Sequence, residues 1–114
     1  MRFLGYTLAD PNTPMPEFDP ELYTRMGEFV AEATQAGVLL ATGGLTPPDQ
    51  ATRVKYSGGE FTVIDGPFAE AKELIGGWAL LEARDREEAL VWCKRFMALA
   101  GEGETRLREV FMPS

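Results

Sequence analysis

The residues with the clearest chemical potential lie in the stretch Asp65-Gly66-Pro67-Phe68, with Lys72 a few positions further on. Gly66 tolerates a positive φ and Pro67 fixes its own φ, so this turn can hold the Asp65 carboxylate in one orientation. A carboxylate held at a strand end could act as a base or as an electrostatic stabiliser. It could also make the turn itself by accepting hydrogen bonds from backbone N–H groups. Both roles, catalytic and structural, are open for Asp65.

Other polar side chains could reach a ligand beside this turn. Tyr6 carries a phenol in the first predicted strand, and Lys72 is close enough in sequence to pair with Asp65. Arg53 and Lys55 alternate with apolar residues, which is typical of the solvated face of a strand. Asp65 is the candidate catalytic residue, and the candidate ligand-binding residues are Tyr6, Asp65, Gly66, Pro67, Phe68 and Lys72.

Histidine is absent from the chain, and Cys93 is its one cysteine. The missing imidazole excludes His-dependent triads, His general acid–base catalysis and nearly every transition-metal site. No acidic loop has the spacing of a calcium or magnesium site. Cys93 lies on an apolar helical stripe beside Trp92 and Phe96, so it is interpreted as a core residue rather than a nucleophile. We therefore expect no metal and no cofactor.

The chain length of 114 residues predicts one domain over residues 1–114. Its 18 acidic and 11 basic residues give a net charge of −7, which argues against direct binding to nucleic acid. No apolar run approaches the ~20 residues of a membrane span, and the apolar part of the amino terminus is too short for a signal peptide. A lone cysteine fits a reducing compartment, so we expect a cytoplasmic protein with no membrane contact.

Proline and glycine divide the chain into short elements. Asp19 followed by Pro20, and Asp85 followed by Glu88, are typical helix starts. Gly58-Gly59 between two β-branched and aromatic runs predicts a hairpin. Strands are predicted over Arg2–Leu8, Val38–Ala41 (ended by Gly43-Gly44), Thr52–Tyr56, Glu60–Ile64, Trp78–Glu82 and Thr105–Met112, helices over Asp19–Gly37 and Asp85–Gly101, and a helical turn over Ala69–Leu74.

Without the hairpin, the predicted order is β-α-β followed by β-α-β. This order predicts an α+β, ferredoxin-like βαββαβ fold with an inserted β-hairpin and both helices on one face of an antiparallel sheet. The other face should alternate with polar residues if water covers it. Apolar residues instead occupy both faces of the first strand and of the last two strands. We therefore expect a second copy to cover this face in a dimeric α/β barrel, although singly exposed apolar residues are the alternative.

Three stretches carry a resemblance to a known family: Ala36–Leu40, Gly43–Pro48 and above all Val63–Glu73. They resemble the YCII-related DGPF-domain proteins, and the similarity covers nearly the whole chain. The resemblance implies a small cytoplasmic bacterial homodimer with a ferredoxin-like α+β barrel. Many members are encoded beside, or fused to, extracytoplasmic-function sigma factors, so it also implies a sigma factor as a further partner.

One branch of the wider YCII superfamily is similar to enzymes that remove chloride from a chlorinated hydroxyquinone with a His–Asp pair. Met26 stands where that resemblance places the His, about three turns before Gly37. Cys93, Lys94, Arg95 and Phe96 follow Trp92, where it places the Asp. Neither member of the pair is present, so dehydrochlorination by that pair is not expected.

Two functions therefore remain open. The first is a ligand-binding or non-catalytic dimer linked to sigma-factor signalling, in which the Asp65–Phe68 turn walls a small-molecule cavity between the sheet and the hairpin. The second is a small-molecule enzyme of lyase, isomerase or dehydrochlorinase-like type. In that enzyme Asp65 is the base, and Tyr6 or Lys72 takes the place of imidazole.

Overall fold

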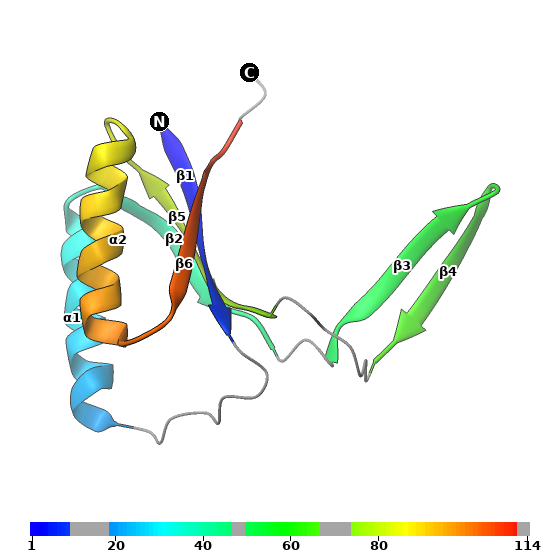
Figure 1. Ribbon diagram of the computed structural model, residues 1–114, viewed down its shortest axis with the longest axis horizontal. Helices are drawn as coiled ribbons and strands as arrows, with labels where there is room; N and C mark the ends of the chain where they lie inside the picture. The colour runs from blue at the N-terminus through cyan, green and yellow to red at the C-terminus, as the bar shows by residue number, and fades with distance from the viewer. Residues whose placement is uncertain (10–18, 47–49, 67–73, 112–114) are drawn as a thin grey trace.

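The computed structural model describes residues 1–9, 19–46, 50–66 and 74–111. Two helices lie along one face of a four-stranded sheet, and a two-stranded hairpin stands apart on the other side (Figure 1). The elements are β1 (Arg2–Ala9), α1 (Pro20–Gln35), β2 (Leu39–Gly44), β3 (Thr52–Ser57), β4 (Glu60–Asp65), β5 (Leu74–Glu82), α2 (Arg86–Ala100) and β6 (Glu104–Glu109).

The strand order in the main sheet is β2-β5-β1-β6, and each neighbouring pair is antiparallel. β1 and β5 therefore form the centre of the sheet although many residues separate them in sequence. β3 and β4 pair with each other in a separate two-stranded sheet. The prediction of a ferredoxin-like α+β fold with an inserted hairpin is confirmed.

Both helices begin where the sequence predicts. The Asp19 side chain accepts a hydrogen bond from the backbone N–H of Glu21 at 3.0 Å, and Asp85 does the same for Glu88 at 2.9 Å. These bonds satisfy amide groups that have no partner inside the helix. After α1, Gly37 adopts a φ of 77°, a left-handed conformation that favours glycine and ends the helix.

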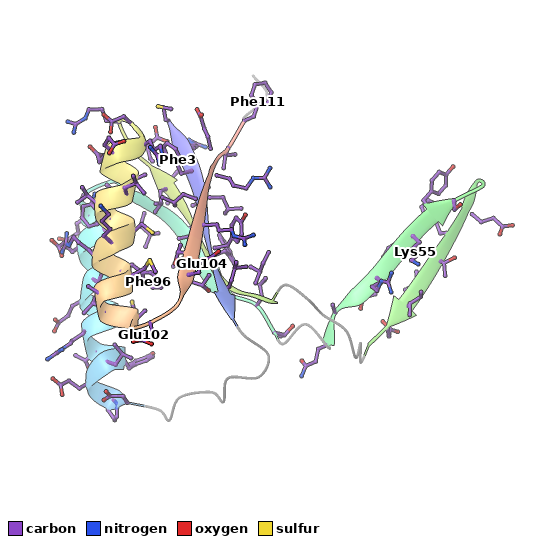
Figure 2. The ribbon with its side chains drawn as sticks, in the orientation of Figure 1. Phe3, Lys55, Phe96, Glu102, Glu104 and Phe111 are labelled. Carbon is purple, nitrogen blue, oxygen red and sulfur yellow. The ribbon has the colours of Figure 1, made fainter. Side chains whose placement is uncertain are left out.

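The core lies between the helices and the sheet. It is built from Phe3, Val38, Leu81, Ala83 and Ala89, all of which are buried. Phe3 and Leu81 sit directly opposite each other on β1 and β5. Figure 2 shows Phe3 and Phe96 in the layer between the sheet and α2.

The two helices are linked to each other by Arg95 of α2. Its guanidinium lies 4.7 Å from the ring centre of Trp92 and 5.3 Å from that of Phe29 in α1. It also pairs with the Glu32 carboxylate of α1. Cation–π contact and ion pairing thus hold the helices side by side over the core.

The predicted ends of two strands were wrong. β2 continues through Gly43 and Gly44, and β5 begins at Leu74 rather than Trp78. Gly43 pairs with Trp78 and Gly44 with Gly77, because a ladder needs only backbone groups and its partner strand decides where it ends. The predicted helical turn fails at Leu74, which belongs to β5, and the rest of it lies outside the described residues.

One face of the sheet points away from the helices. Since Phe3 and Leu81 face the core, their sequence neighbours Leu4 and Leu80 face the other way, as do Tyr6 and its cross-strand partner Trp78. We call this the outer face; its apolar members are Leu4, Tyr6, Leu8, Trp78 and Leu80.

The last strand departs from the predicted pattern. β6 ends at Glu109 rather than Met112, and it turns Arg106 and Arg108 toward the outer face, opposite Tyr6 and Leu4. The prediction that both faces of this strand are apolar was therefore wrong. At a sheet edge, arginine side chains can reach water beyond the apolar centre. The outer face is thus apolar over the middle of β1 and β5, with the Arg2–Glu82 ion pair at one end. Along β6 it is charged, and there Arg106 pairs with Glu104.

Candidate functional site

A cavity of about 170 Å³ lies between the helices and the sheet. Met26 and Phe29 of α1 and Trp92 and Phe96 of α2 form its helical wall. Gly5 of β1 forms part of the sheet side. Apart from two threonines and one cysteine, the described residues around it are glycine, aliphatic, methionine or aromatic, so the space suits an apolar guest.

Small residues at the centre of the core leave this space. Gly5 is buried in the middle of β1 and has no side chain to fill the space between the sheet and the helices. Ala33 of α1, also small and buried, lines the same cavity. A Cβ built on Gly5 would come within 3.1 Å of the Leu107 side chain, so Leu107 already leans over the glycine. Glycine inside a strand often marks such a close approach.

The described lining residues with a hydroxyl or thiol are Thr42, Thr105 and Cys93, and Trp92 adds an indole N–H. The Thr42 hydroxyl donates to the backbone carbonyl of Trp78 at 2.8 Å. Burial raises the pKa of the Cys93 thiol above its ordinary value of 9.0, so the thiol stays protonated and unreactive near neutral pH. The cavity thus offers weak hydrogen-bonding groups and no charged group from this lining.

A second hollow of about 170 Å³ adjoins the first toward the end of the sheet. It shares Gly5, Thr42, Phe96 and Thr105 with the first cavity and adds Thr7, Gly43, Gly77 and Trp78. The Thr7 hydroxyl accepts a hydrogen bond from the Gly77 amide at 2.9 Å. A ligand larger than the first cavity could therefore extend toward a more polar end.

The structure separates the site residues that the sequence indicated. Tyr6 lies on the outer face, opposite Trp78 and Arg106, and is not part of the cavity lining. Asp65 ends β4 in the other sheet, where it is exposed and accepts a hydrogen bond from the Thr52 hydroxyl at 3.0 Å. Pro67, Phe68 and Lys72 lie outside the described residues.

The Gly66 amide donates to the Ala51 carbonyl at 3.1 Å, so the ends of the hairpin are closed by backbone and side-chain bonds together. The bond that Asp65 accepts comes from the Thr52 hydroxyl, whereas the structural role considered for Asp65 was to accept backbone N–H bonds. The part of the expected sheet–hairpin cavity that falls on residues 67–73 lies outside the described residues. The first cavity reported above lies instead on the helix side of the sheet.

Sequence reasoning assigned the cavity residues to the core and missed the space between them. Met26, Phe29, Trp92 and Phe96 read as ordinary apolar stripes on two amphipathic helices. The signal that could have revealed the cavity was Gly5, a residue without a side chain in the middle of a central strand. The structure also places Met26, Cys93 and Phe96, which stand at or near the positions of the missing His–Asp pair, on this cavity.

Within the described residues, no cluster of three or more His, Cys, Asp or Glu side chains could hold a metal ion. None of the described helices has the length and apolarity required to span a membrane.

The sheet, the two helices on one of its faces and the cavity between them define a ferredoxin-like α+β protein with an apolar internal site. The chain belongs to the YCII-related domain family, whose model matches residues 1–111.

A curated relative, an uncharacterized protein of Rhizobium meliloti (strain 1021), is 41% identical over 74 residues, which are 65% of this chain. The match spans about 60% of that relative's length. Among solved structures, the chain is similar to the 5-chloro-2-hydroxyhydroquinone dehydrochlorinase TftG from Burkholderia phenoliruptrix in complex with 2,5-dihydroxybenzoquinone. That similarity has a TM-score of 0.47 and 16% identity over 99% of this chain and 96% of the other.

Proposed function

We propose that the protein is a non-catalytic homodimer that binds a small apolar or aromatic molecule between its helices and its sheet. The observation that supports this most is the cavity of about 170 Å³ walled by Met26, Phe29, Trp92 and Phe96. An apolar protein cavity of about 150 Å³ is large enough to bind one benzene molecule. The ligand is therefore a compact ring compound held by shape and dispersion.

The groups around the cavity support binding rather than catalysis. General acid–base catalysis needs a titratable group within hydrogen-bond reach of the reacting proton. The described lining provides two threonine hydroxyls and the Cys93 thiol, whose pKa is raised by burial. Asp65, the base of the alternative enzyme, lies in the other sheet and is bonded to Thr52.

The outer face supports the homodimer. Its five apolar side chains include two aromatic residues, Tyr6 and Trp78, which lie side by side on β1 and β5. A second copy packed against this face would remove them from water and leave Arg106 and Arg108 at the rim. The resemblance to DGPF-domain proteins supports the same dimer, the cytoplasm as its location and a sigma factor as a further partner.

A binding experiment with benzene tests the cavity. We expect benzene to raise the melting temperature of the protein, because a ligand that binds only the folded state stabilises it by mass action. Ala33→Leu adds three carbon atoms to a buried wall residue and should abolish this rise. Ala31→Leu is the matched control, because it makes the same change at an exposed position of the same helix.

One outcome of the benzene experiment would contradict the proposed site. If benzene stabilises Ala33→Leu as much as the unchanged protein, the ligand binds elsewhere and the proposed site is wrong. Ala33→Leu can itself cost about 1–3 kcal/mol through overpacking. Each variant is therefore compared with and without benzene, and the measured quantity is the change that benzene causes.

A further inference from the structure

The hairpin of β3 and β4 has one strongly apolar face. Val54 pairs with Val63 and Tyr56 with Phe61, so all four side chains point to the same side of the ribbon. Their exposed fractions are 65%, 63%, 67% and 73% respectively. The centres of the Tyr56 and Phe61 rings lie 4.8 Å apart, so the two rings contact each other. We call these four residues the apolar hairpin face.

The opposite side of the ribbon is mostly polar, and its apolar member is Ile64, which pairs with Arg53. Arg53, Lys55 and Thr62 alternate with the apolar residues and are exposed. Lys55 lies on the part of the ribbon that projects away from the helices and the main sheet (Figure 2). A two-stranded hairpin alone is marginally stable in water, and this hairpin exposes its apolar residues instead of burying them. An amphipathic ribbon of this kind needs a surface to pack on.

We propose that the apolar hairpin face packs against a second copy of this chain, so that each protomer holds the other with an arm. This inference rests on the homodimer of the proposed function and adds a second contact to it. The hairpin projects on the side of the main sheet that carries the outer face, away from the helices (Figure 1). A copy that covers the outer face therefore lies beside the hairpin.

The exposed area favours a second copy as the occupant. Tyr56 and Phe61 are each about two-thirds to three-quarters exposed, and an aromatic side chain can bury about 200 Å². With the two valines, one arm offers several hundred Å² of apolar surface. Two-fold symmetry doubles this contribution, and the covered surface of the other protomer adds a similar amount. The total reaches the range above about 1,200 Å² that specific interfaces bury.

Charge favours the same occupant. The hairpin segment 52–65 carries two basic residues, Arg53 and Lys55, and two acidic residues, Glu60 and Asp65, so its net charge is zero. The whole chain carries −7. The arm can therefore approach a second copy without adding to the repulsion between two acidic chains.

Light scattering of matched variants tests the arm. The variant Tyr56→Ser/Phe61→Ser removes the two rings of the apolar hairpin face. The control Lys55→Ser/Thr62→Ser changes the neighbouring directly opposed pair on the other side of the ribbon. We expect the unchanged protein and the control to show about twice the chain mass of 12.6 kDa at micromolar concentration. The ring variant should need at least tenfold more protein to dimerise.

A photo-cross-linking experiment locates the contact directly. Benzoylphenylalanine replaces either Phe61, on the apolar hairpin face, or Thr62, the next residue on the opposite face. We expect illumination to give a covalent product of doubled mass from position 61 and much less from position 62. Far-UV circular dichroism confirms that each variant keeps the fold of the unchanged protein.

The possible failures are distinct. If Tyr56→Ser/Phe61→Ser dimerises as tightly as the control, the proposed contact of the apolar hairpin face is wrong and the homodimer still stands. Monomeric unchanged protein at micromolar concentration overturns the arm and the homodimer together and assigns the apolar hairpin face to another partner. Neither result bears on the cavity, which the benzene experiment tests separately.

Discussion

Asp65 and Thr52 join the two ends of the hairpin through one hydrogen bond between side chains. Both residues are exposed, so water can replace either partner when the other is removed. We expect Asp65→Ala to lower the free energy of unfolding by about 0.5 kcal/mol or less, and Asp65→Asn to lower it less still. Urea denaturation measures both values.

The control for this prediction is Thr52→Val, which removes the other partner of the same bond. The double variant Asp65→Ala/Thr52→Val should lower the free energy of unfolding no more than either single change, because each single change already removes the same hydrogen bond. A loss of about 1–3 kcal/mol for Asp65→Ala alone would show that the carboxylate serves buried donors instead.

Some residue roles could be predicted from sequence because they depend on near neighbours. Asp19 and Asp85 cap helices two and three residues away, and Gly37 ends α1 where its own backbone requires a positive φ. The partner of Asp65 was not predictable in this way. Thr52 is thirteen residues earlier and reaches Asp65 only because the hairpin register brings them together.

At the scale of the elements, one glycine determines how β2 fits against β5. A Cβ built on Gly43 would lie 3.0 Å from Nε1 of Trp78 and 3.1 Å from two ring carbons. The indole thus occupies the space above Gly43. We expect Gly43→Ala to lower the free energy of unfolding by about 1 kcal/mol, because the Trp78 ring must shift away from the new Cβ in a packed position.

Gly44→Ala is the control for this change. It makes the same substitution on the next residue, where the nearest atom to the new Cβ is the Gly76 carbonyl oxygen at 3.9 Å. Urea unfolding of the two variants should separate them clearly. Equal stabilities would show that the ring adapts freely and that Gly43 does not position Trp78.

The elements that were predicted with the wrong ends share one physical cause. Paired glycines normally indicate a strand end, and Gly43-Gly44 are the last two residues of β2, although they still pair with β5. Gly76-Gly77 instead lie inside β5, where Gly77 pairs with Gly44. Backbone pairing across β2 and β5 decides this, and neither segment alone contains that information. The cavity has the same origin, since Gly5 meets Leu107 only through the pairing of β1 and β6.

At the scale of the whole molecule, one chain is more extended than a compact domain of its length. Its Cα radius of gyration is 16.6 Å, and its extents are 47 × 43 × 19 Å. A compact domain of this length has a radius of gyration of about 13 Å. The projecting hairpin accounts for the difference, and on the same side the sheet leaves its apolar outer face uncovered (Figure 1). Both features are ones that a second copy would cover.

The proposed dimer predicts that thermal stability depends on protein concentration. Folding and association are then coupled, and a hundredfold rise in concentration adds about 2.7 kcal/mol per dimer. We expect a rise of several degrees in the melting temperature, which calorimetry at two concentrations measures.

Leu80→Glu should remove this dependence, because it places a charge on the outer face next to Leu4, where a dimer would bury it. Val91→Glu makes the same kind of change at an exposed position of α2, outside the proposed interface, and should retain the dependence. If the melting temperature of Leu80→Glu still rises with concentration as much as that of Val91→Glu, the chains associate through a surface other than the outer face. The arm proposal would then fail as well, because the hairpin projects on the side of the outer face and can contact only a copy bound on that side.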